Sequence, residues 1–181
     1  MSIIDTLITD RTESDVNYAA QLAQKGWAAM TATEKAAWIA GLKGSYNAAD
    51  LNRVGTAVLY VAAELSGIGY FVSVNPKTDW AETDIPTIAQ MQTYLDDIGA
   101  ILAALSVPSG IPSVPDSMAL LNYTKANHIE RILVEIDQLV QNIIASFVPC
   151  GLPYCGQLWQ EYMITDASLV GTALVGSAIL I

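Results

Sequence analysis

Basic residues are scarce in this chain. Its 181 residues include 8 Lys and Arg against 18 Asp and Glu, which gives a formal net charge of −10. Affinity for nucleic-acid phosphates and for anionic membrane surfaces depends on Lys and Arg. We therefore expect neither a nucleic-acid partner nor electrostatic attachment to a membrane. The first 15 residues have no basic flank and no apolar run of signal-peptide length, so we also expect no general secretion.

Histidine and cysteine are equally scarce. The chain has one histidine, His128, and two cysteines, Cys150 and Cys155, within the stretch CGLPYCG. Zinc sites use four ligands, usually from two close pairs, and here the second pair is missing. The redox spacing Cys-x-x-Cys is also missing. Geometry allows a local disulfide, but a cytosolic setting favours thiols, and we interpret both cysteines as small apolar residues. The sequence predicts no metal and no cofactor.

Groupings of side chains typical of catalysis are missing too. Asp96 and Asp97 are adjacent, so on a helix they diverge by about 100°, and we interpret them as a solvated face. Asp79 and Asp84 precede a predicted helix, where carboxylates favour capping and dipole interactions. We assign His128 to packing or capping, because it has no second histidine or nucleophile elbow beside it. No glycine pattern matches a phosphate-binding loop. The sequence predicts no catalytic residue.

Apolar residues are abundant, at 52% of the chain, and they follow helical spacing over long stretches. Three capping signals place Asp or Glu three residues after Thr12, Thr31 and Asn47. They predict helices over 12–30, 31–44 and 47–67. Pro86 suits the first turn of a fourth helix, whose apolar residues form one stripe over 88–105.

The strongest predicted helix runs from Thr124 to Phe147 and has a wide apolar face. Two interpretations stay open for it, the central helix of a bundle or a self-associating coiled coil. We expect a mainly α fold, a helical bundle with a long C-terminal helix followed by a short glycine-punctuated β segment. The predicted parts are an N-terminal helical region over 1–106, a Pro-rich connector over 107–117, the long helix over 118–148 and the β-type assembly segment over 149–181. Short strands are predicted at 70–74 and, as an alternative to a docking arm, at 3–9.

The C-terminal segment has a distinct composition. Residues 149–181 contain no Lys or Arg and only Glu161 and Asp166 as acids, and LVGTALVGSAILI at 169–181 is free of charge. As a helix this stretch is too short for a bilayer core of about 30 Å, so we expect no membrane span. An uncovered apolar strand tends to pair with another chain or with another part of its own chain. We therefore expect a homo-oligomer, with a trimer as one arrangement.

Tryptophans are the remaining candidates for a binding surface. We predict that Trp27, Trp38 and Trp80 are core anchors, since each buries a large apolar area. Trp159, close to Tyr154 and Tyr162, stays open as part of a carbohydrate-binding surface.

Several motifs occur together and in a fixed order between residues 3 and 143. They are GLKGSYN at Gly41–Asn47, DLNRV at Asp50–Val54, TDW at Thr78–Trp80, DIPT at Asp84–Thr87, the pairs Gln90–Met91 and Tyr94–Leu95, and YTKANHIE at Tyr123–Glu130. With these motifs the chain resembles a family of small tail-module proteins from prophages of Gram-positive bacteria and from phage-tail-like particles. The stretch CGLPYCGQL is similar to the Tyr/Cys-Gly repeats at the end of such proteins.

The resemblance implies a non-enzymatic structural component of the baseplate, adaptor or fibre region, with other tail proteins as partners. Its place would be the virion or tail-like particle, after synthesis in the cytoplasm of the host bacterium. The alternative function is a module at the tail tip or fibre that binds carbohydrate on the host cell surface.

Overall fold

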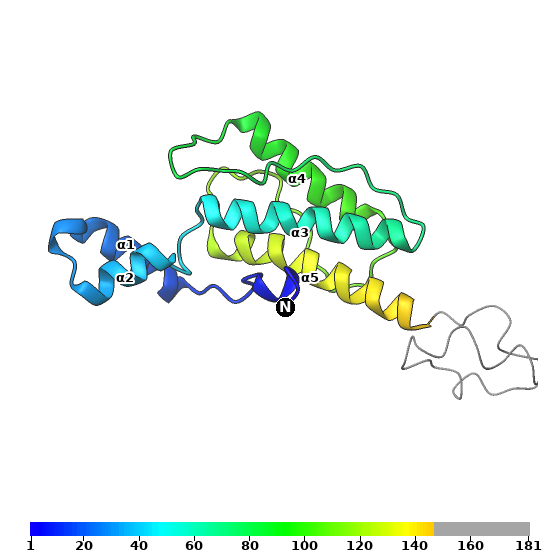
Figure 1. Cartoon of the computed structure of the whole chain (residues 1–181), viewed down its shortest axis with the longest axis horizontal. Coiled ribbons are helices and arrows are strands. Elements are labelled where there is room, and N and C mark those ends of the chain that lie inside the picture. Colours follow the sequence, from blue (N-terminus) through cyan, green and yellow to red (C-terminus); the bar gives the residue numbers. More distant parts are fainter. Residues whose placement is uncertain (147–181) are drawn as a thin grey trace, which may run out of the picture. The chain divides into compact units, whose positions relative to one another are not determined.

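The computed structural model describes residues 1–146, and these residues are mainly helical (Figure 1). The elements in chain order are the 3-10 turn η1 (Ile4–Thr6), α1 (Glu13–Lys25), the 3-10 turn η2 (Trp27–Ala29), α2 (Ala32–Ala40), α3 (Ala48–Gly67), α4 (Ile88–Ala103) and α5 (Tyr123–Ser146). Residues 1–140 form one compact unit. The predicted β segment at 149–181, with Cys150, Cys155 and Trp159, lies outside the described residues.

The helix starts confirm the three capping signals. Thr12, Thr31 and Asn47 each accept a hydrogen bond from the backbone three residues on, and the acidic side chain there accepts one from the cap residue. The α2 helix ends at Gly41, with φ of 92°, rather than at the predicted Gly44. Gly44 has a different role, because a Cβ atom there would lie 2.0 Å from the carbonyl oxygen of Asp15.

Helices α3, α4 and α5 lie side by side and run in the same direction, and we call them the three-helix bundle (Figure 1). Parallel neighbours need long return connections, which are the loops over 68–87 and 104–122. The apolar faces of the three helices meet in one core, whose fully buried side chains include Val54, Val58, Val61, Leu65, Ile98, Ile101, Ile129, Ile132, Leu133 and Ile136. This burial supports the interpretation of α5 as a central bundle helix.

The predicted strand at 70–74 is wrong. These residues belong to the return loop, and Phe71 is 85% exposed. The loop runs back along α3, so its backbone has no neighbouring strand to pair with in the described part of the chain. Residues 1–146 contain no named strand and only an isolated bridge between Ser109 and Ile111. Residues 3–9 form η1 and an extended arm.

The α4 helix begins at Ile88, whereas the prediction placed Pro86 in its first turn. Thr87 caps it in a capping box with Gln90, so Pro86 lies outside the helix. The predicted stripe is wrong at its start, where Ile88 is 90% exposed. The buried face instead begins at Tyr94 and Leu95, because the first turn of α4 extends beyond the neighbouring helices.

Candidate functional site

A cluster of four charges, three of them buried and Arg53 partly buried, joins the N-terminal arm to the three-helix bundle. The Arg11 guanidinium donates to Asp50 Oδ1 at 2.9 Å and to Glu130 Oε1 at 2.7 Å. Arg53 also donates to both carboxylates. Arg11, Asp50 and Glu130 are 4%, 5% and 0% exposed. Two positive and two negative side chains therefore compensate one another out of water, as buried charges require.

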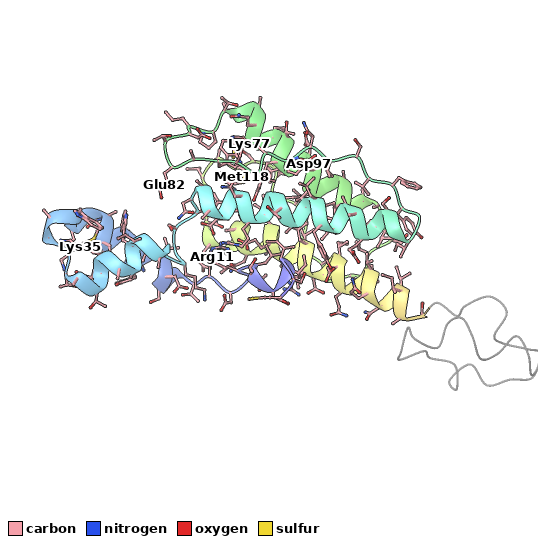
Figure 2. The ribbon with its side chains drawn as sticks, viewed as in Figure 1. Arg11, Lys35, Lys77, Glu82, Asp97 and Met118 are labelled. Atoms are coloured by element: carbon pink, nitrogen blue, oxygen red, sulfur yellow. The ribbon has the colours of Figure 1, made fainter. Side chains whose placement is uncertain are left out.

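Backbone groups complete this charge cluster. Arg11 donates to the carbonyls of Lys43 and Ile8, and the Ile8 N–H donates to Glu130 Oε2 at 2.6 Å. Asn127 of α5 makes two further hydrogen bonds with the backbone of Arg11, each 2.9 Å long. The N-terminal arm thus pairs with a helix more than 100 residues away, and Figure 2 shows Arg11 beside α5 and α3.

The environment of the cluster shifts the protonation equilibria of its neighbours. Burial lowers the pKa of Arg53, but its hydrogen bonds and charge interactions with Glu130 and Asp50 outweigh this and raise the pKa. The Tyr46 and Tyr94 hydroxyls share a hydrogen bond of 2.6 Å, and burial raises the pKa of both. The Arg11 guanidinium lies 5.3 Å from the centre of the Tyr46 ring, within range of a cation–π attraction. Tyr46 and Tyr94 stay neutral at neutral pH, because burial raises the pKa of both.

A second set of polar contacts fixes the return loop to α3. The Asn52 amide donates to the Trp80 carbonyl at 2.9 Å and accepts from the Trp80 N–H at 2.7 Å. Lys77 pairs with Asp79 at 2.6 Å and lies over the Trp80 ring. A Cβ atom on Gly55 would lie 2.9 Å from the Lys77 carbonyl, so only glycine lets the loop pass this close.

Asp96 and Asp97, the adjacent carboxylates of α4, differ in their exposure to solvent. Asp96 is exposed, as predicted, but Asp97 is 7% exposed, so the solvated-face interpretation is wrong for it. Asp97 Oδ1 accepts a hydrogen bond from the Asn75 N–H at 3.1 Å, and burial raises the pKa of Asp97. Through this hydrogen bond the Asp97 carboxylate joins the return loop to α4, and Asp97 is labelled in Figure 2.

Asp79 and Asp84 do not cap α4. Both lie near Lys77, and Asp84 also accepts from the Ala81 N–H within the preceding turn. His128 is partly buried on α5. The structure brings none of these residues together with the buried charge cluster.

The tryptophans divide into two groups. Trp80 is 6% exposed and confirms the prediction of a core anchor. Trp27 and Trp38 are 52% and 41% exposed, so the same prediction is wrong for them. Both belong to the short helical region over 13–40, which has too little neighbouring structure to enclose an indole.

The buried cluster was not predicted from the sequence, although three of its four charged residues lie in the motifs quoted above. Asp50 and Arg53 lie in the DLNRV motif, and Asn127 and Glu130 lie in YTKANHIE. The sequence did contain a signal for the burial of Glu130. Glu130 lies three residues before the apolar Leu133, so a charge occupies the apolar face of the strongest predicted helix. Its partner Arg11 lies 119 residues away, and helical periodicity carries no information on such a pairing.

Residues 1–146 contain no group of three or more His, Cys, Asp or Glu side chains able to hold a metal ion. Within the same range, no helix is both long and apolar enough to cross a membrane. No protein-family model, curated protein or solved structure matches this chain.

Proposed function

We propose that this chain is a non-enzymatic structural component of a phage tail or tail-like particle, in its baseplate, adaptor or fibre region. It assembles there through its apolar C-terminal segment, residues 168–181. The observation that carries the proposal is the use of the motif residues. Asp50, Arg53 and Glu130, from two separate motifs, meet in one buried cluster that ties the arm to two helices.

The other motifs supply contacts of the same kind. Asn52 holds Trp80 of the TDW motif, Tyr46 pairs with Tyr94, and Thr87 caps α4. Side chains whose polar atoms are used to join elements contribute to the shape and rigidity of the chain. A motif set devoted to such contacts is what a building block of a larger particle needs, and it agrees with the resemblance to tail-module proteins.

The test is a truncation that removes residues 168–181. We expect the truncated chain to keep its helical circular dichroism and to stay monomeric, because the proposed assembly segment is gone. The full chain should co-purify with tail particles in fixed copy number, as shown by quantitative mass spectrometry. A truncated chain that enters particles in the same copy number as the full chain contradicts the proposal.

A second candidate function, binding of host cell-surface carbohydrate, is favoured by one observation. Trp27 and Trp38 expose large indole surfaces, and aromatic rings of this kind offer flat apolar faces at wet interfaces. Lys35, labelled in Figure 2, lies 5.4 Å from the centre of the Trp27 ring. Retention of the purified chain on host cell walls, lost in Trp27→Ala and kept in Phe71→Ala, would support this function over a purely structural one.

A further inference from the structure

An open apolar groove lies between the two short N-terminal helices and the bundle. It has a volume of about 1010 Å³, and its lining residues come from α1, α2, the start of α3 and the loop over 80–86. Small and apolar side chains dominate the lining, including Val16, Ala19, Ala23, Trp38, Leu51 and Pro86. A groove of this composition gains free energy when apolar surface covers it.

The edges of the groove carry large apolar side chains that water still reaches. Ile39, which lines the groove, is 76% exposed, and Trp38 is 41% exposed. Ile85 lies in sequence between Asp84 and Pro86, which both line the groove, and it is 88% exposed. Large apolar side chains that stay exposed at a groove are typical of an interaction site.

A buried donor in the groove lining points to a peptide as the occupant. Trp80 lines the groove, and its indole N–H is buried without an acceptor in residues 1–146. An unmet buried donor costs about 1–3 kcal/mol. A peptide brings backbone carbonyl acceptors together with apolar side chains, so a peptide matches the chemistry of this lining.

The negative charge of the groove lining and of the whole chain determines which kind of peptide can bind. Glu82 and Asp84 belong to the groove lining, and the chain as a whole carries a net charge of −10. An acidic segment would be repelled, whereas a neutral apolar segment would not. Residues 168–181, SLVGTALVGSAILI, are neutral and apolar, and they lie beyond the end of α5 at Ser146. Their Gly, Ala and Ser residues have the small side chains that a shallow groove accepts.

We propose that this groove receives residues 168–181 of a neighbouring copy of the chain. The inference rests on the proposed function, since it names the surface on which the assembly segment acts. Every copy then has one donor segment and one acceptor groove, which are different parts of the chain. Such head-to-tail contacts close into rings or extend into filaments.

Photo-crosslinking of the full chain tests the proposal. A photoreactive amino acid replaces Ile39, which is exposed enough to tolerate the change. This chain is mixed with a 15N-labelled wild-type chain before assembly, and crosslinked peptides are identified by mass spectrometry. We expect crosslinks from position 39 to 15N-labelled peptides within 168–181. Crosslinks to unlabelled peptides alone, or to other regions of the chain, would overturn docking between copies.

A matched pair of variants gives the second measurement. Ile39→Asp places a charge at the groove edge and should weaken self-association by about tenfold or more in analytical ultracentrifugation. Phe71→Asp, at a site 85% exposed and outside the groove lining, should leave self-association unchanged. Equal association of both variants would overturn the proposal.

The two proposals fail in different ways. If position 39 crosslinks only to a different tail protein inside particles, the groove is not a site for this chain and the structural function stands. If the crosslinks to 168–181 form in the pure protein but the chain is absent from particles, the docking stands and the proposed function fails.

Discussion

The α1–α2 hairpin, residues 13–40, and the three-helix bundle differ in where they keep their apolar side chains. The bundle buries nine residues of α3, five of α4 and seven of α5. The hairpin buries only Leu22 and Met30 and leaves Trp27, Trp38 and Ile39 exposed. The hairpin is therefore stabilised chiefly by local contacts, its two capping boxes and the Lys25–Glu34 ion pair.

The comparison suggests a division of roles. A region held by local contacts opens at low free energy, whereas a region with a shared core opens only on global unfolding. The side of the chain that carries the groove is therefore the adaptable one, and the bundle is the rigid support. Substitutions in each region test this difference.

Glu130→Gln should strongly destabilise the bundle. The change leaves Arg11 and Arg53 with one carboxylate, Asp50, in a buried cluster. Removing one partner from a buried ion pair costs about 3–5 kcal/mol of unfolding free energy. Urea unfolding followed by circular dichroism measures the loss. Glu135→Gln on the exposed side of the same helix is the control and should cost less than about 1 kcal/mol.

Leu22→Ala should affect the hairpin alone. Leu22 is 2% exposed and is the one buried residue of α1, so its truncation costs at least about 2 kcal/mol of local stability. Hydrogen exchange should become faster for amides of α1 and α2 and stay unchanged for α3 and α5. Faster exchange throughout the bundle would show that both regions unfold as one unit.

Gly55→Ala tests how closely the return loop packs against α3. The new Cβ would meet the Lys77 carbonyl at 2.9 Å, so the return loop must shift, at a cost of about 1–3 kcal/mol. Gly67→Ala at the end of the same helix meets nothing within 4 Å and should be neutral or stabilising. Thermal unfolding of the two variants side by side gives the measurement, and equal melting temperatures would contradict the close approach of the loop.

Lys25→Gln is the mildest change and concerns the hairpin. The hydrogen bond from Lys25 lowers the pKa of Glu34 from 4.5 to about 2, with the Thr31 backbone as the next cause. The stabilisation from this shift is present above pH 4.5 and is lost as the pH falls towards 2. In the variant the pKa should rise towards 4.5, as NMR titration of the carboxyl carbon would show. An unchanged pKa would mean that the capping contacts alone lower it.

Local features of the fold could be read from the sequence. The three capping boxes depend on residues three apart, and α5 begins at Tyr123, one residue before the predicted Thr124. The wrong predictions concern residues whose contacts lie far away in the sequence. The strand pattern at 70–74 was overridden because the return loop packs along α3 through Asn52 and Gly55.

The candidate site was less predictable for the same reason. Burial of Asp97, exposure of Trp38 and the pairing of Arg11 with Glu130 all follow from which elements become neighbours. Single-residue properties predict the opposite in the first two cases, since carboxylates favour water and indoles favour the core. The resemblance motifs marked the correct residues but did not give their purpose.

The contact between Arg11 and Glu130 also sets an order of events during synthesis. The two residues are 119 positions apart, and a ribosome adds about 5–20 residues per second. Roughly 6–24 seconds therefore pass between translation of the arm and translation of its carboxylate partner. Throughout that interval α3 and α4 lack the third face of their core. Docking of the arm therefore waits until α5 has been synthesised as far as Glu130.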